Sequence, residues 1–146
     1  MLHACGIAWS PTIKDALADA AITKRLAVVV FTGSDWSARG LKLDETVFMN
    51  AEFADRFMKN FALVNADFPQ RKPPAPELLA ENTSWATRLG IKSWPTLVAL
   101  RADGTEFARL EYKEESAPEV LAITESWIAA RAQESGATAS TPIPPP

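Results

Sequence analysis

The chain has 146 residues, of which 47% are hydrophobic and 23% are charged, and its formal net charge is −3. These values are typical of one globular domain with a sizeable core, and the acidic balance argues against a nucleic-acid-binding surface. No apolar run approaches the roughly 20 residues that a membrane-spanning helix needs. One cysteine and one histidine exclude an internal disulfide, a Cys-x-x-Cys redox pair and a Cys/His-rich zinc site, so we expect no metal and no cofactor.

The N-terminal third of the chain predicts a helix followed by a buried strand. Ser10 is suited to cap a helix over residues 12–24, with Pro11 at the first helical position, where a missing N–H is no loss. Residues 26–31 read LAVVVF, a continuous β-branched run of the kind found in a central strand that is covered on both faces.

The rest of the chain predicts further helices and strands in alternation, and then a tail. Alternation of apolar and polar residues over 61–67 predicts a half-covered strand. Asp103-Gly104 is a hairpin-turn signal, and residues 134–146 form a low-complexity segment that cannot bury enough surface to fold. The remaining predicted elements are helices over 38–48, 51–60, 77–89 (with Gly90 as C-cap) and 117–133, and strands over 96–100 and 106–112.

This order predicts an α/β fold with a four-stranded mixed sheet flanked by helices, the thioredoxin-like arrangement. The first two strands are joined by helix, so we expect them to be parallel with a right-handed crossover, while the last two form an antiparallel hairpin. The predicted domain organisation is an N-terminal segment over 1–8, a thioredoxin-like domain over 9–133 and a disordered proline-rich tail over 134–146.

Short motifs add a resemblance to that pattern. FTGSDW at 31–36, followed by a four-residue slot and a helix ending in Val47-Phe48, resembles thioredoxin-like proteins that read FTGSDWCxxC. LVNADFP at 63–69 resembles the family's second strand and its exit. Trp94-Pro95-Thr96 resembles the loop that carries the family's cis-proline, and ADGTE at 102–106 its hairpin. The resemblance covers roughly residues 9 to 130 and implies that Pro95 is cis.

The resemblance breaks at the chemistry. The slot that holds Cys-x-x-Cys in the family reads Ser37-Ala38-Arg39-Gly40 here. Thiol–disulfide exchange needs one thiolate to attack and a second sulfur to resolve the mixed disulfide, so we expect no catalytic residue in this degenerate site. Ser37 is better read as the N-cap of the following helix. The strand before the site, Val28–Phe31, also lacks the buried carboxylate that many thioredoxins carry there.

A binding surface remains where the redox groups are lost. In the family, the cis-proline loop presents its backbone to an extended peptide, as in β-augmentation. The resemblance therefore implies an extended peptide or protein partner, bound in a groove to which Phe68-Pro69 and the basic residues Arg71, Lys72 and Lys92 contribute. The alternative is that Trp36 and Trp94 only fill space in the core. The candidate binding residues are Trp36, Ser37, Arg39, Trp94 and Pro95.

The first residues leave several alternatives open. Cys5 is either close to Ser37, where it would be a reactive thiol, or at the opposite end of the sheet, where it is incidental. Residues 2–6, LHACG, loosely resemble a bacterial lipobox, which would make the protein lipid-anchored or periplasmic if an upstream signal segment has been removed. As the sequence stands we expect a cytoplasmic protein. Met1-Leu2-His3 has the groups for a square-planar Cu(II) site, although chance occurrence is the favoured interpretation.

The sequence thus supports three functional hypotheses. The first is a redox-inactive module that binds peptides or proteins through the former active-site face. The second is residual enzymatic activity, either monothiol chemistry through Cys5 or glutathione-linked chemistry with Ser37 as a hydrogen-bond donor. The third is deliberate replacement of the cysteines, against which Gly40 argues, because serine or alanine is the usual replacement.

Overall fold

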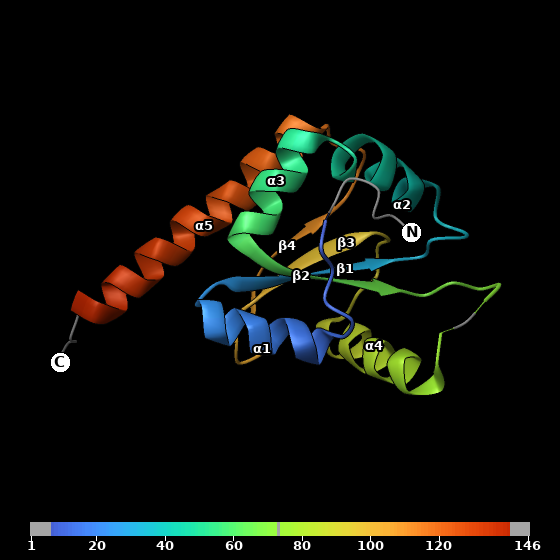
Figure 1. Ribbon diagram of the computed structural model, residues 1–146, viewed down its shortest axis with the longest axis horizontal. Helices are drawn as coiled ribbons and strands as arrows, with labels where there is room; N and C mark the ends of the chain where they lie inside the picture. The colour runs from blue at the N-terminus through green and yellow to red at the C-terminus, as the bar shows by residue number, and fades with distance from the viewer. Residues whose placement is uncertain (1–6, 73, 141–146) are drawn as a thin grey trace.

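The computed structural model describes residues 7–72 and 74–140, which form one mixed sheet with helices on both faces (Figure 1). The strand order is β2-β1-β3-β4. β1 pairs in parallel with β2 and antiparallel with β3, and β3 pairs antiparallel with β4. In chain order the elements are α1 (Ile13–Thr23), β1 (Leu26–Thr32), α2 (Ala38–Leu43), the π-helical turn η1 (Asp44–Phe48), α3 (Ala51–Asn60), β2 (Phe61–Asp67), α4 (Pro76–Leu89), β3 (Thr96–Leu100), β4 (Glu106–Glu111) and α5 (Ala117–Ser140).

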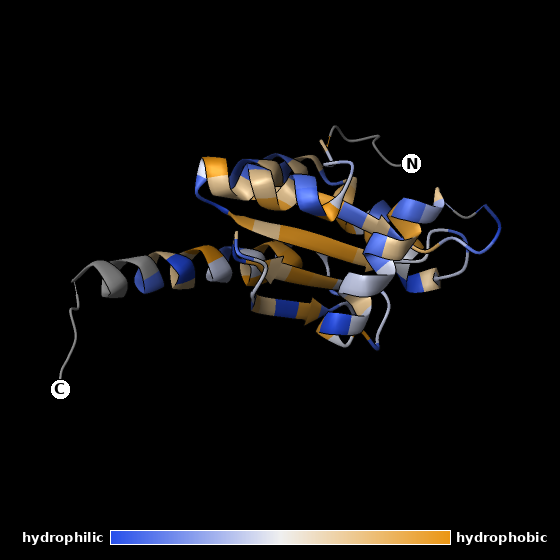
Figure 2. Ribbon diagram, turned by 90° about the horizontal axis from the view of Figure 1, so that it is seen from below, coloured by the Kyte–Doolittle hydropathy of each residue, from blue (hydrophilic) through white to orange (hydrophobic). Residues whose placement is uncertain are grey.

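Two apolar layers hold the helices against the sheet. α1 and α4 cover one face, and α2 with η1, α3 and α5 cover the other (Figure 1). All seven residues of β1 are buried, because successive side chains point into opposite layers. Figure 2 shows the strands as the most hydrophobic part of the molecule, enclosed between more polar helices. The predicted fold class is confirmed.

The second strand differs from the half-covered strand that its alternating sequence predicts. Phe61 and Leu63 of β2 are buried in one layer, and Ala62, Val64 and Ala66 are buried in the other. The segment before α1 covers the outer edge of this strand, since the Ser10 N–H donates to the Leu63 carbonyl oxygen over 2.7 Å.

That pairing also corrects the predicted start of the first helix. Ser10 is not the N-cap, because its backbone is engaged at the edge of the sheet. Thr12 is the N-cap instead, with its Oγ1 accepting from the Asp15 N–H at 3.0 Å, and Pro11 lies outside the helix.

The last helix is longer than predicted. α5 continues to Ser140, although the low-complexity composition after Gln133 predicts a disordered tail from Glu134 onward. Arg101 explains part of the difference, because its guanidinium pairs with the Glu134 carboxylate at 2.7 Å and anchors the helix beyond the sheet. Residues 1–6 of the predicted N-terminal segment (1–8) and residues 141–146 of the predicted tail (134–146) lie outside the described residues. In the part of the chain that is described, no helix combines the length and apolarity needed to cross a bilayer.

The two candidate caps of α1 can be separated by mutation. We expect Thr12→Ala to lower the free energy of unfolding by about 1 kcal/mol, because it leaves the Asp15 N–H without its partner. Ser10→Ala should cost less than about 0.5 kcal/mol, because Ser10 contributes through its backbone. Urea denaturation of both variants measures the difference, and equal losses would contradict the assignment of Thr12 as the cap.

Candidate functional site

The segment that follows β1 is fastened to the segment that follows β2. The Ser34 N–H and hydroxyl donate to the two carboxylate oxygens of Asp67, at 2.7 and 2.5 Å. The Asp35 carboxylate accepts from the backbone N–H groups of Gln70 and Arg71, at 2.9 and 2.8 Å. These two N–H bonds are the main reason that the pKa of Asp35 is lowered. The loop after β2 is therefore held beside the former active site by fixed polar contacts.

Trp36 completes this attachment and is the site's exposed aromatic residue. Its indole Nε1 donates to the Phe68 carbonyl oxygen at 2.7 Å, while 41% of the residue's surface stays accessible. The ring lies directly on Gly33, where an added Cβ would come within 2.0 Å of the indole. Gly33 is thus required for Trp36 to fold back onto the loop.

Ser37 and Gly40 stand at the two positions where the resemblance places cysteines, and both are closed. Ser37 is buried and its Oγ accepts from the Gly40 N–H at 3.0 Å, which makes it the N-cap of α2, as the sequence suggests. Gly40 is packed against Thr32, since an added Cβ would lie 2.6 Å from the Thr32 Oγ1. Ala38 and Arg39, between them, point outward and are exposed.

Three aromatic side chains gather beside this closed site. The Trp36 and Trp94 rings meet edge to face with centroids 5.9 Å apart, and Phe68 meets Trp94 in the same way at 5.2 Å. They form one side of a groove of about 410 Å³, which we call the aromatic groove. Its residues are Trp36, Phe68, Thr83, Ala86, Thr87, Ile91 and Trp94.

The sequence predicted the aromatic side of this groove but not the side formed by α4. Trp36, Phe68 and Trp94 each lie in a motif that resembles the family. Thr83, Ala86 and Thr87 share one side of α4 and have no signal that separates them from an ordinary solvated helix face. Only the packing of α4 against the sheet brings them to the aromatic side chains.

The loop before β3 leaves its backbone available next to the groove. The Trp94–Pro95 peptide bond is cis, and Pro95 is buried, with its carbonyl oxygen accepting from the Tyr112 N–H at 3.1 Å. Among the described residues, the N–H and C=O of Trp94 have no hydrogen-bond partner. Of the five candidate binding residues, Trp36, Arg39 and Trp94 therefore lie at the surface, whereas Ser37 and Pro95 support it from below.

One acidic group near this end of the sheet has an unusual environment. Asp44 begins η1, and burial raises its pKa to about 6, with the negative charges of Asp67 and Glu45 adding to the effect. Asp44 was not predicted from the sequence. The acid considered there was one on the strand before the site, residues 28–31, whereas Asp44 lies on the helical segment after the site.

The described residues offer no metal centre, since no three of their His, Cys, Asp or Glu side chains lie together in a suitable group. His3 and Cys5, with the thiol and Cu(II) hypotheses attached to them, lie outside the described residues.

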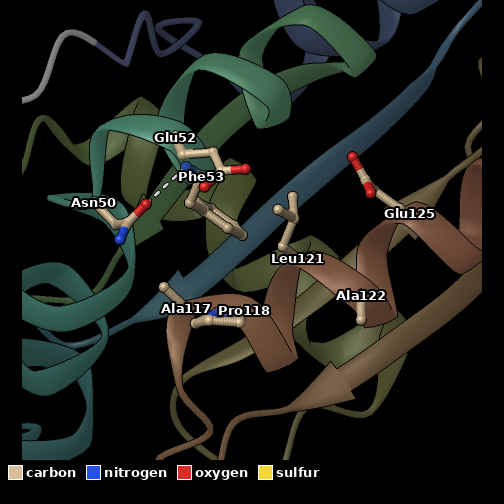
Figure 3. A pocket seen from close by; sticks show the side chains of 8 residues that line it. All are labelled: Asn50, Glu52, Phe53, Ala117, Pro118, Leu121, Ala122 and Glu125. Carbon is tan, nitrogen blue, oxygen red and sulfur yellow. Dashed lines mark hydrogen bonds between the residues drawn. The ribbon is translucent and has the colours of Figure 1, made fainter.

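A second hollow, of about 220 Å³, lies between the N-terminal ends of α3 and α5 (Figure 3). Its polar groups already have partners. Asn50 caps α3 by accepting from the Phe53 N–H at 2.9 Å. Arg56 bridges Glu52 and Glu125 at 3.4 and 2.8 Å. We therefore take the aromatic groove as the candidate functional site.

The contact between Gly40 and Thr32 predicts a coupled pair of substitutions. Alanine normally stabilises a helix interior relative to glycine, but we expect Gly40→Ala to lower the free energy of unfolding by about 1 kcal/mol, because its Cβ overpacks against the Thr32 side chain. In a Thr32→Ala background the same change should become neutral or stabilising. A double-mutant cycle measured by urea denaturation tests this, and additive effects would contradict the contact.

The raised pKa of Asp44 predicts a pH-dependent stability. Between the ordinary value of 3.8 and the folded value of about 6, the folded protein holds a proton that the unfolded chain releases. Stability is therefore lost as the pH rises through 6. Asp44→Asn should be more stable than the natural chain by about 1–2 kcal/mol at pH 7, after allowance for partial exposure, with the gain disappearing near pH 4.

Denaturation at a series of pH values measures this trend. Glu77→Gln, which removes a negative charge from an exposed position at the start of α4, on the other face of the sheet, is the control for charge alone. A constant difference between Asp44→Asn and the natural chain from pH 4 to pH 7 would contradict the assignment.

Comparison with known proteins agrees with the geometry. The family model of the thioredoxin-like domain matches residues 13–124. The disulfide bond reductase DsbH of Chlamydia pneumoniae is 28% identical over 83 residues, which are 57% of this chain and 50% of that protein. The thioredoxin-related protein DsbJ of the same organism is 23% identical over 104 residues, 71% of this chain and 30% of that protein. The chain thus spans half or less of the length of these curated relatives.

A solved structure of the DsbH oxidoreductase superposes with a TM-score of 0.78, covering 84% of this chain and 85% of that chain. At 22% identity this likeness concerns the fold. The family model covers most of the chain, and the four-stranded mixed sheet is the arrangement that the resemblance predicts. The chain belongs to the thioredoxin-like domain family.

Proposed function

We propose that this chain is a redox-inactive member of its family that binds extended peptide segments of a protein partner. The observation that carries the proposal is the combination of a closed catalytic slot with an open aromatic groove beside it. Ser37 and Gly40 are both buried in helix-capping and packing contacts, whereas Trp36 remains 41% exposed at the rim of the groove.

Disulfide exchange lacks its chemical requirements in this chain. It needs a thiolate and a resolving sulfur, and the sequence contains one cysteine in total. Two of its relatives are named as a disulfide bond reductase and a thioredoxin-related protein. We infer that this chain kept their scaffold and lost the electron transfer that a cysteine pair supplies.

Peptide binding has the groups that it needs. The unpartnered N–H and C=O of Trp94 can pair with an extended backbone, which is the mode of β-augmentation. The rings of Trp36, Phe68 and Trp94 provide apolar contact beside that backbone, and tryptophan is enriched among residues that dominate binding energy. The attachment of residues 67–71 by Ser34, Asp35 and Trp36 fixes the groove before a partner arrives, which lowers the entropy lost on binding.

The redox part of the proposal is tested by insulin reduction with dithiothreitol. The natural chain should not increase the rate above dithiothreitol alone, and Cys5→Ser should behave identically. Turnover by the natural chain that disappears in Cys5→Ser would overturn the proposal in favour of monothiol chemistry.

The binding part is tested with an unfolded protein whose cysteines are reduced and capped with iodoacetamide, so that capture cannot depend on thiols. We expect Trp36→Ala/Trp94→Ala to weaken capture at least about tenfold, the effect of losing roughly 1.4 kcal/mol. Trp85→Ala is the matched control, because Trp85 lies on α4 outside the groove and packs near Gly104 and Arg88. Unchanged capture by the folded double variant would refute the groove as the binding site.

A further inference from the structure

The charge around the aromatic groove is opposite to that of the whole chain. The segments that build the groove and its surroundings, residues 33–40, 67–72 and 83–94, contain five basic and two acidic side chains, although the formal net charge of the chain is −3. Four of the basic residues, Arg39, Arg71, Lys72 and Lys92, form what we call the basic rim. Arg88 is not counted, because its guanidinium stacks 4.1 Å from the centre of the Trp85 ring, outside the groove.

The two acidic residues of these segments, Asp35 and Asp67, accept hydrogen bonds from within the protein. Asp35 accepts from two backbone N–H groups of the neighbouring loop. Asp67 accepts from the N–H and hydroxyl of Ser34. Their oxygens are thus directed at the segments that they join. Both keep their negative charges, so these three segments together have a net charge of +3 (five basic minus two acidic residues).

The basic rim is exposed and forms no salt bridge within the described residues. All four side chains are exposed. After the two backbone N–H bonds, the charge of Arg71 also helps to lower the pKa of Asp35, although the two side chains form no salt bridge. Elsewhere on the molecule, Arg25, Arg56, Arg101 and Arg109 each pair with an acid. A surface of unpaired cations on an acidic protein attracts an anionic partner and repels a cationic one.

The position of the rim fits a peptide that crosses the groove. Lys92 stands between Ile91 and Trp94, which both line the groove. Arg71 and Lys72 follow Phe68 on the attached loop, and Arg39 follows Trp36 at the start of α2. Each cation of the rim therefore lies within four positions along the chain of a residue that lines the groove.

From this arrangement we propose that the groove recognises an acidic extended peptide, with one large apolar side chain in the aromatic groove and Asp or Glu residues on either side. The inference rests on the proposed peptide-binding function and adds the chemical class of the partner. It assigns specificity to the basic rim and affinity to the aromatic side chains, since rim charges mainly steer association and select among partners.

Three labelled synthetic peptides test the inference by fluorescence anisotropy with the full chain. Each has a central phenylalanine, and the flanking residues are Glu, Lys or Ser. We expect the Glu peptide to bind about tenfold more tightly than the Lys peptide at low ionic strength, with the Ser peptide between them. The preference should shrink at high ionic strength, because the rim is exposed and salt screens it.

Charge reversal provides the matched comparison. Arg71→Glu/Lys92→Glu should abolish or invert the preference for the Glu peptide. Lys24→Glu/Lys59→Glu changes the net charge equally at the other end of β1, beside Leu26 and Phe61, and should leave the preference intact. Equal loss in both variants would show that net charge alone is responsible and would overturn the role of the rim.

The outcomes separate this inference from the proposed function. If the three peptides bind equally and both reversals are silent, peptide binding stands and the acidic preference is refuted. If no peptide binds and the capped unfolded protein is not captured, the proposed function itself fails. A thymidine oligonucleotide serves as a competitor, because stacking side chains with cations also suit single-stranded nucleic acid; its binding in preference to the Glu peptide would overturn the peptide assignment.

Discussion

Burial of β1 on both faces is the constraint on which the rest of the structure depends. Its seven residues lie between β2 and β3, and they alternate between two apolar layers. Each layer must be covered by helices, because a strand of this kind cannot leave either face to water. The chain that leaves β1 therefore enters α2 on one face, and the parallel partner β2 ends at the same edge of the sheet (Figure 1).

That parallel pairing creates the candidate site. Thr32 is in register with Asp67, so residues 34–36 and 67–71 emerge side by side although more than thirty positions separate them. Short polar contacts then fix the two segments to each other, and the indole of Trp36 spans both. The two positions where the resemblance places cysteines are closed by helix capping and packing, and the aromatic groove lies beside them.

Most secondary structure was predictable, because apolar periodicity reports local burial directly. The ranges of α3, β2 and β3 agree with the predicted ones. The errors occurred where distant contacts overrode local signals. Ser10 joins the sheet edge instead of capping a helix, both faces of β2 are covered, and Arg101 anchors α5 beyond Gln133. None of these contacts is encoded in a window of neighbouring residues.

The sequence by itself determined the fold class, the loss of the cysteine pair and the aromatic residues at the former active-site face, because residue identity and spacing carry that information. Tertiary structure decided the rest. It closed Gly40 against Thr32 and brought the side of α4 to Trp36 and Trp94. Four exposed cations that form no salt bridge within the described residues come from three of the segments around the groove. These features depend on which segments the sheet register and helix packing bring together, and local sequence does not specify that.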